Sequence, residues 1–288
     1  MRRTLPYDPR SQLAPRSGWV ALLGRRTIYA WRGYRALWTT LSDALGSVKT
    51  PGESARTTAR RIALAQIQFT GVQAVTLVSL IAIFIGATII IQTNVLAPGT
   101  PADMLGKILV AVVPRELAPL ITAIVVAGRS GTAIATEIGN MRANSEVLAL
   151  ASLGIDPPRF IVLPRIIATV VSVLVLTVYF SVVAILGGYV VSLFITSTSF
   201  GALRAGFAQA LGPADLLLFL LKGVGLGAIV GWLSCHYGLQ VKSSPTEVPQ
   251  QASRAVMLSL FGCVAYNTLV TACFYWIVGA PIQGTGPF

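Results

Sequence analysis

The sequence predicts an all-α integral membrane protein with five transmembrane helices. Of its 288 residues, 54% are hydrophobic and only 11% are charged, whereas about a quarter of the residues of a soluble domain carry charge. Five apolar runs reach the ~20 residues that a helix needs to cross a hydrocarbon layer of about 30 Å. An N-terminal amphipathic helix at the membrane interface and a polar cytoplasmic helix complete the expected fold.

The N-terminal segment is basic and aromatic. Residues 1–17 are polar and contain prolines, so we expect them to be poorly ordered; residues 18–56 predict an amphipathic helix and a linker. Trp31, Tyr34 and Trp38 are spaced for one helix face and arginines occupy much of the rest, as in a helix lying in a membrane interface. Packing against a soluble protein is the alternative, and the three tryptophans of this segment favour the membrane.

The five apolar runs lie within residues 57–288. They cover approximately residues 69–92, 112–135, 160–194, 214–235 and 255–278. Because the third run exceeds one straight crossing, we expect it to tilt, to bend near Gly187–Gly188 or to continue past the bilayer. The polar stretch 137–153, between the second and third runs, predicts one further helix, which ends before Gly154 and two prolines.

The distribution of basic residues predicts the orientation. With the N-terminus in the cytoplasm, the inside segments are residues 1–68, 129–165 and 238–254, and they hold eighteen of the 22 Lys and Arg residues. The positive-inside rule therefore places the N-terminus and the helix at 137–153 in the cytoplasm and the C-terminus outside. The net charge of +12 indicates contact with anionic lipid headgroups rather than nucleic acid, because twelve basic residues precede residue 62, beside the first span.

Small residues recur every fourth position along two predicted spans. Such stripes let helices approach closely in lipid, so we expect these faces to pack against other helices, in the same chain or in a second copy. The second span and its continuation carry one stripe and the fourth span carries the other, formed by Ala123, Ala127, Gly131, Ala135 and Gly139 and by Gly223, Gly227 and Gly231.

Three charged residues lie near the outer ends of their spans. Arg115 and Glu116 begin the second span, and Lys222 lies in the fourth. Charges at membrane depth are costly and usually pair or line a wet cavity. One interpretation is a site for a polar headgroup; the other is that Lys222 extends to the interface while Arg115 and Glu116 cap a helix.

Several classes of chemistry lack their sequence patterns. There is no GxxxxGK[ST] loop, so ATP and its Mg²⁺ would have to be bound by a partner. No metal-ligand spacing occurs, and the three cysteines are interpreted as packing residues. Gly128–Gly131 matches a GxSG pattern, and Ser130 with His236 could form a protease dyad, but the pattern is short and lies in a packing stripe. We therefore expect no catalytic residues and no enzyme.

Four motifs follow one another through the central sequence. They are a Glu-Leu-Ala-Pro opening, an AGRxGxAIxxEIGxM core, a GIDP and a VxPR, at Glu116–Pro119, Ala127–Met141, Gly154–Pro157 and Val162–Arg165. This series resembles the MlaE/YrbE family, permeases of ABC transporters that work with MCE-domain proteins, in which the opening is Glu-Leu-Gly-Pro; here Ala118 replaces the glycine. The resemblance covers approximately residues 57–280 and identifies residues 57–288 as a permease domain.

The resemblance implies a homodimer in a bacterial inner membrane, driven by cytoplasmic ABC ATPase subunits. It also implies an MCE-domain partner on the periplasmic side and, in many relatives, a STAS-domain protein. The implied cargo is phospholipid. It implies a lipid cavity near Arg115 and Glu116, to which we add Lys222. It also makes the helix at 137–153 the coupling helix that contacts the ATPase, with the candidate residues Glu137, Met141, Arg142, Glu146, Val147, Leu148 and Leu150. The family often has acidic residues where this chain has Ser145, Leu148 and Ala151.

The sequence thus predicts the permease subunit of an ATP-driven transporter that moves phospholipid, or a related lipid, between inner and outer membranes. In the predicted mechanism two copies pack through the small-residue faces, and the coupling helices transmit motion from the ATPases to the cavity. The alternatives are an ion-coupled secondary transporter, for which the spans lack acidic residues near the midplane, and an intramembrane serine protease that uses Ser130 and His236.

Overall fold

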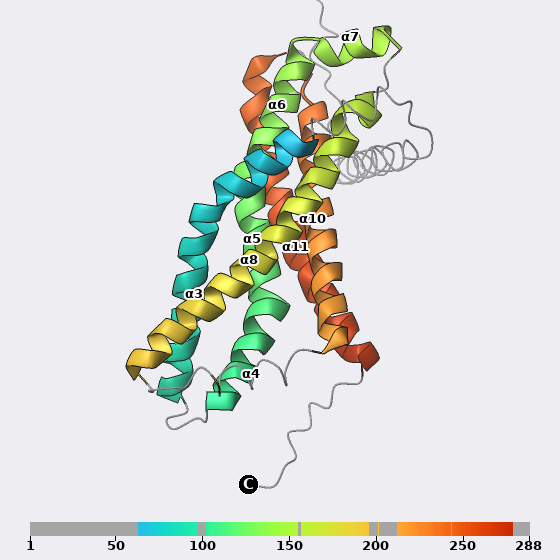
Figure 1. Cartoon of the computed structure of the whole chain (residues 1–288). Coiled ribbons are helices and arrows are strands. Elements are labelled where there is room, and N and C mark those ends of the chain that lie inside the picture. Colours follow the sequence, from blue (N-terminus) through green and yellow to red (C-terminus); the bar gives the residue numbers. More distant parts are fainter. Residues whose placement is uncertain are drawn as a thin grey trace, which may run out of the picture. The chain divides into compact units, whose positions relative to one another are not determined.

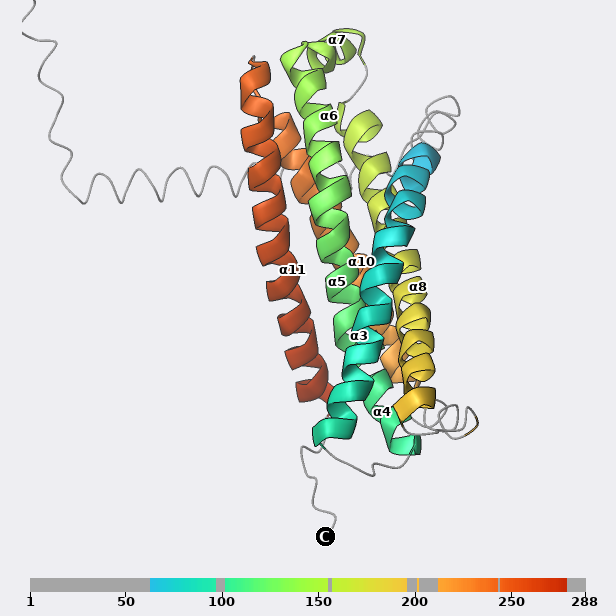
Figure 2. The ribbon, with the colours of Figure 1, turned by 90° about the vertical axis from the view of Figure 1, so that its left-hand side faces the viewer.

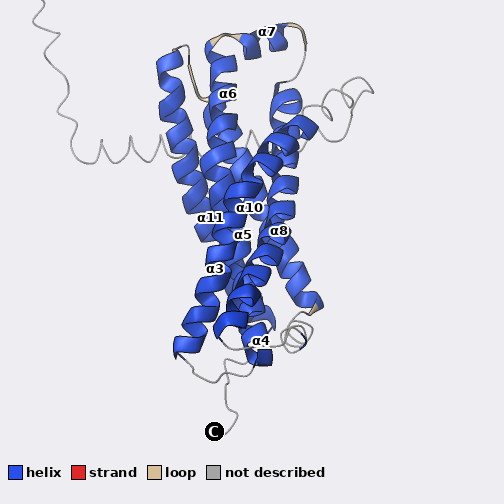
Figure 3. Cartoon of the chain, turned by 60° about the vertical axis from the view of Figure 1, so that its left-hand side comes forward, coloured by secondary structure: helices blue, strands red, loops and turns tan. Residues whose placement is uncertain are grey.

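The computed structural model describes residues 63–96, 102–154, 157–195, 201, 212–242 and 244–278. Within these ranges every regular element is helical (Figure 3). The interfacial helix and linker expected over residues 18–56 lie outside the described residues.

Five helical segments are long and apolar enough to cross a membrane, which confirms the predicted fold class. Large apolar side chains project outward from them: Phe84 is 63% exposed, Leu217 67% and Phe261 75%. Exposed residues of this kind are expected where the solvent is lipid. The segments are Ala63–Leu96, Lys107–Ala143, Phe160–Phe194, Pro213–Leu239 and Pro245–Trp276.

The first and third spans pack closely along their length. The first comprises residues 63–71, the 3-10 turn η3 (Val72–Ala74) and α3 (Val75–Leu96), and α3 contacts α8 (Leu163–Ile195). Gly86 is the point of closest approach, because a Cβ there would collide with the Ala184 carbonyl and reach within 3.0 Å of the backbone of Gly188. The helix α8 is uninterrupted through Gly187–Gly188, so this glycine pair permits close packing rather than breaking the helix.

The second span alternates between α-helical and π-helical geometry. It consists of α4 (Ala102–Val112), the π-helical turn η4 (Val113–Leu117), α5 (Ala118–Val126), the π-helical turn η5 (Ala127–Gly131) and α6 (Thr132–Ala143). A third π-helical turn, η6 (Pro158–Val162), precedes α8. Such single turns insert an extra residue and are frequent at functional sites. Here η5 coincides with the AGRSG part of the core motif, and η4 overlaps the start of the Glu116–Pro119 motif.

The single helix expected over residues 137–153 is divided into two. The span continues as α6 to Ala143, and a separate short helix α7 (Glu146–Ser152) follows. Ser145 lies between them with φ of 62°, a left-handed conformation that the interior of an α-helix cannot accommodate. The chain therefore changes direction, and α7 lies at the end of the bundle away from α4 (Figure 1).

The fourth span lies among the others. It forms α10 (Pro213–Leu239), which contacts α8, α11, α6 and α5. The 3-10 turn η7 (Pro245–Glu247) leads into α11 (Val248–Val278), which packs on α10 and α6. Figure 2 shows α11 and α3 on the two sides of the second span.

Candidate functional site

A buried lysine forms the centre of a charged cluster. Lys222 on α10 is fully buried, and its Nζ lies 2.8 Å from Glu116 Oε2 of η4. The same ammonium group donates a hydrogen bond to the backbone carbonyl of Arg115 at 2.7 Å. Burying a single charge in an apolar environment costs several kcal/mol, so these acceptors stabilise the ammonium group where it lies. The interpretation that Lys222 extends to the interface is wrong.

Glu116 also connects η4 to α11. Asn267 Nδ2 donates to Glu116 Oε2 at 3.1 Å, and Thr271 Oγ1 donates to Glu116 Oε1 at 3.0 Å. The carboxylate thus has partners on two spans, yet 33% of the side chain stays exposed. It can therefore stabilise helix packing and still present negative charge to a ligand.

Arg115 makes the second ion pair of the cluster. Its Nε lies 2.9 Å from Asp215 Oδ1 and its Nη2 donates to Asp215 Oδ2 at 3.0 Å, so the ion pair includes a charge-assisted hydrogen bond. Asp215 also accepts a hydrogen bond from the Gly212 backbone N–H at 3.0 Å and so caps the start of α10. The Arg115 side chain is 23% exposed.

The structure therefore brings all three predicted lipid-cavity residues together, with three that the sequence reasoning missed. Asp215 precedes Lys222 by seven residues, or about two helical turns, so the two side chains lie on the same face of α10. This spacing could have indicated from the sequence that Asp215 belongs to the cluster. Asn267 and Thr271 are polar residues four apart within an apolar span, another detectable sign of a paired site. What the sequence could not give was the pairing across three spans.

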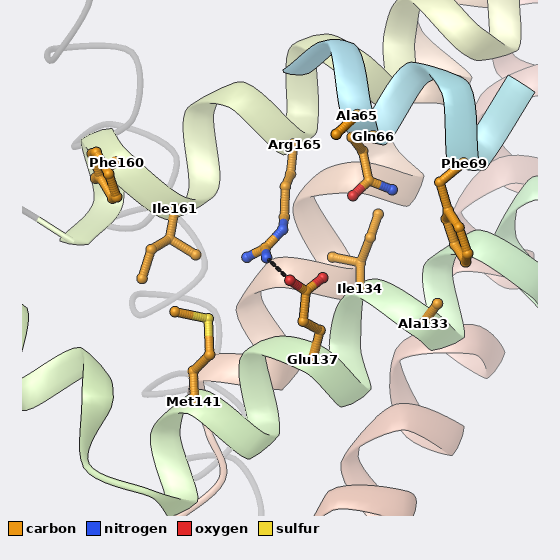
Figure 4. A pocket seen from close by; sticks show the side chains of 10 residues that line it. All are labelled: Ala65, Gln66, Phe69, Ala133, Ile134, Glu137, Met141, Phe160, Ile161 and Arg165. Carbon is orange, nitrogen blue, oxygen red and sulfur yellow. Dashed lines mark ion pairs between the residues drawn. The ribbon is translucent and has the colours of Figure 1, made fainter. Parts of the chain in front are cut away.

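A third ion pair, at a separate site, joins α6 to the start of α8. Arg165 Nη2 lies 2.6 Å from Glu137 Oε1, beside a pocket of about 590 Å³ (Figure 4). Glu137 follows Glu116 by 21 residues along the second span, about 31 Å at 1.5 Å per residue. The two charged sites are therefore separated by approximately the thickness of a hydrocarbon layer.

The predicted coupling residues divide into inward and outward groups. Val147 is buried, with Met141 and Leu150 packed against the same apolar cluster. Glu137 pairs with Arg165. The outward residues are Arg142, Glu146 and Leu148, the last 64% exposed. Together with Glu137, whose side chain is 58% exposed despite its ion pair, this outward group offers a surface to a partner without repacking of the chain.

Both small-residue stripes are buried inside the chain. Ala123, Ala127, Gly131, Ala135 and Gly139 are all buried, as are Gly223, Gly227 and Gly231. A Cβ on Gly131 would lie 2.9 Å from Ser234 Oγ of α10, and one on Gly227 would lie 2.7 Å from Val170 Cα of α8. The hypothesis that two copies pack through these faces is therefore wrong, because helices of the same chain already occupy them.

The residues proposed for a protease dyad do not form one. Ser130 is fully buried and its Oγ has no hydrogen-bond partner, while His236 Nε2 lies 2.7 Å from Gln240 Nε2. A serine nucleophile needs a base within hydrogen-bond reach. Among the described residues, no group of three or more His, Cys, Asp or Glu could hold a metal ion.

Comparison with known proteins gives the family. The family model "Permease MlaE" matches residues 63–273. The "Probable ABC transporter permease protein slr1045" of Synechocystis is 32% identical over 232 residues, 79% of this chain and 84% of the relative. The "Intermembrane phospholipid transport system permease protein MlaE" of Haemophilus influenzae is 27% identical over 212 residues, 73% of this chain and 81% of the relative.

A plant relative extends the similarity to chloroplasts. The "Protein TRIGALACTOSYLDIACYLGLYCEROL 1, chloroplastic" of Arabidopsis thaliana is 30% identical over 179 residues, 62% of this chain and 51% of that protein. The residues matched by the family model include the first four spans, the fifth as far as residue 273, both ion-paired sites and the three π-helical turns. The chain belongs to the MlaE permease family.

Proposed function

We propose that the chain is the membrane subunit of an ATP-driven transporter that moves phospholipid between two membranes. Membership of the MlaE permease family supports the class of protein, and the name of the Haemophilus relative supports the cargo. The observation that carries the proposal is the cluster around Lys222. A fully buried ammonium held by a partly exposed carboxylate lies beside apolar spans, and a phospholipid needs both environments.

In this proposal the headgroup contacts the exposed parts of Arg115 and Glu116. Lys222 does not touch the lipid; it fixes the position of Glu116 from behind. A guanidinium and a carboxylate side by side can pair with the phosphate and the amine of a zwitterionic headgroup. The acyl chains lie against the apolar walls of the first, second and fifth spans.

The short helix α7 is the proposed contact with the ATPase. Leu148 projects outward from α7, and Val147 anchors the helix to the bundle. An apolar side chain on a short helix can enter a groove of a partner. Because α6 is the last part of the second span, a displacement of α7 would reach the span as a rigid-body movement.

The proposed assembly is a homodimer with two cytoplasmic ATPase subunits, which bind ATP and Mg²⁺, an MCE-domain protein on the periplasmic side and a STAS-domain protein. The N-terminus is cytoplasmic and the C-terminus periplasmic, in a bacterial inner membrane. The basic residues support this orientation, since eighteen of 22 lie in the segments assigned to the cytoplasm.

Reconstitution tests the proposal. The full chain, co-purified with its ATPase, is placed in liposomes that contain a fluorescent phospholipid, and transfer of this lipid to the MCE-domain protein is measured with and without ATP. We expect ATP-dependent transfer that falls at least tenfold in Glu116→Ala, because that change leaves Lys222 buried without its carboxylate. Transfer that is independent of ATP, or no ATPase in the purified complex, would contradict the proposal.

A further inference from the structure

Arg165 is a buried arginine with most of its donors unused. Its side chain is only 7% exposed and pairs through Nη2 with Glu137, while Nε and Nη1 have no hydrogen-bond partner. A guanidinium group carries five N–H donors, and leaving buried charged donors unsatisfied is unfavourable. The arrangement therefore lacks an acceptor on the side of Arg165 that Glu137 does not occupy.

The surroundings of Arg165 are a pocket rather than packed protein. Its volume is about 590 Å³, within the range of small-molecule sites. Figure 4 shows the guanidinium between side chains of the first span, α6 and η6. Apart from Arg165, Glu137 and Gln66, the lining is apolar, formed by Ala65, Phe69, Ala133, Ile134, Met141, Phe160 and Ile161.

A second arginine lies over Phe69, one of the aromatic residues that line this pocket. Arg129 of η5 lies over Phe69, with its guanidinium carbon 5.6 Å from the ring centroid, and its Nη2 donates to Gln73 Oε1. Its Nη1 is buried and has no hydrogen-bond partner. Beside it is a smaller pocket of about 290 Å³ that shares Phe69 and Ala65 with the first and is also lined by Val72. Two cations and one carboxylate thus line or adjoin the two neighbouring pockets, and the charge balance favours an anion.

Exposed apolar side chains continue from the pockets along the first span. Leu64 is 63% exposed and Val72 65%, while Phe69 is 37% exposed. Inorganic phosphate would gain nothing from these residues, whereas an acyl chain would be stabilised by burying their surface. The combination of unused cationic donors and an apolar wall fits an amphiphile with an anionic group.

We propose that these two pockets form a second phospholipid site at the end of the bundle that carries α7. Arg165, assisted by Arg129, binds the phosphate group through charge-assisted hydrogen bonds, and the acyl chains lie along Phe69 and Val72. The site is about 31 Å along the second span from the Glu116 cluster, so the two sites serve opposite leaflets. This inference rests on the proposed lipid transport. It identifies the place where lipid is bound in the leaflet opposite to the Glu116 cluster.

Photo-crosslinking tests the site directly. The full chain in detergent is incubated with a phosphatidylethanolamine that carries a diazirine in its acyl chain, and labelled peptides are identified by mass spectrometry. We expect labelling within residues 64–73 and 158–162 and, separately, near Thr271 beside the Glu116 cluster. Arg165→Gln should lower the first labelling about tenfold, the effect of losing a charge-assisted hydrogen bond, and leave the second unchanged. Arg254→Gln is the matched control, because Arg254 is an exposed arginine on α11.

A second variant separates binding from folding. Ala65 is exposed and lines both pockets, so Ala65→Trp should fill them without altering charge and should also lower labelling of residues 158–162. Equal labelling of wild type and both variants would overturn the proposal. Loss of lipid labelling on addition of inorganic phosphate alone would also overturn the proposal, because the site would then bind free phosphate. Exclusion of lipid from the pocket by a bound protein subunit would overturn it as well.

The same experiment distinguishes this inference from the proposed function. Labelling near Thr271 without labelling around Phe69 would overturn the second site and support lipid binding at the Glu116 cluster. Absence of labelling at both places would overturn both.

Discussion

Lys222 Nζ lies 2.8 Å from Glu116 Oε2, and the lysine is completely buried while the glutamate remains one-third exposed. The two residues come from different spans, 106 positions apart in the sequence. Removing one partner of such a pair leaves an uncompensated buried charge, which usually destabilises a protein more than replacing both. This asymmetry makes the pair testable without any knowledge of the cargo.

Glu116→Gln should destabilise the purified chain by about 3–5 kcal/mol, because it leaves the buried ammonium group of Lys222 without its carboxylate. Adding Lys222→Met should restore part of that loss, since methionine carries no charge that must be neutralised. Thermal unfolding in detergent measures both effects in a double-mutant cycle. Lys242→Met is the matched control, because Lys242 is exposed, and a cycle with no coupling would contradict a stabilising pair.

Gly131→Leu should disrupt folding or transport, because a Cβ at Gly131 would lie 2.9 Å from Ser234 Oγ and the larger side chain must separate the second and fourth spans. Overpacking of this kind costs about 1–3 kcal/mol or more. Gly128→Leu provides the comparison within the same π-helical turn, since nothing lies within 4 Å of a Cβ there. Size-exclusion chromatography and thermal unfolding compare the two variants. Equal stability of the two would show that the stripe is not closely packed.

Leu148→Asp should release the ATPase subunit from the complex, because it places a charge on the outward apolar residue of α7. We expect at least tenfold less ATPase in the purified complex, with the fold of the chain retained. Gln250→Asp adds the same charge at an exposed position on α11 and should have little effect. If the Leu148→Asp chain co-purified with a normal amount of ATPase, the proposal that α7 contacts the ATPase would be wrong.

Glu146→Cys and Trp276→Cys should react with a membrane-impermeant maleimide from opposite sides of the membrane, in a background without the three native cysteines. Glu146 is exposed on α7, and Trp276 is 87% exposed near the end of α11. The positive-inside distribution predicts that Glu146→Cys reacts only after the inner membrane is opened. Labelling of Glu146→Cys in intact spheroplasts would reverse the proposed orientation.

The relation between α6 and α7 shows where pattern reasoning failed. Polar residues and the Gly154 stop signal fitted one helix over 137–153, but Ser145 adopts a left-handed conformation and divides it. Serine has no strong preference for such a conformation, in contrast to glycine, so the residue type gave no warning. The π-helical turns η4, η5 and η6 were equally invisible, because hydrophobic periodicity does not resolve a single inserted residue.

The small-residue stripes show a partial success. Every stripe residue is buried, as the four-residue spacing predicted, yet the spacing could not name the partner. In the structure Gly131 packs against Ser234 and Gly227 packs against Val170, and both contacts lie within the chain. A third close approach, at Gly86 with Ala184 and Gly188, was missed because Val78 and Ile90 interrupt the run of small residues on α3.

The sequence by itself determined the membrane-spanning class, the five spans and the family motifs, because apolar run length and local residue order are one-dimensional properties. It also identified Arg115, Glu116 and Lys222 as unusual, since charge in an apolar run is visible without a fold. Only the tertiary structure decided that Lys222 binds Glu116, that Asp215, Asn267 and Thr271 complete the cluster, and that Arg165 has donors to spare beside a pocket. Pairing between spans depends on helix rotation and crossing, which packing of all five helices sets together and which no single segment encodes.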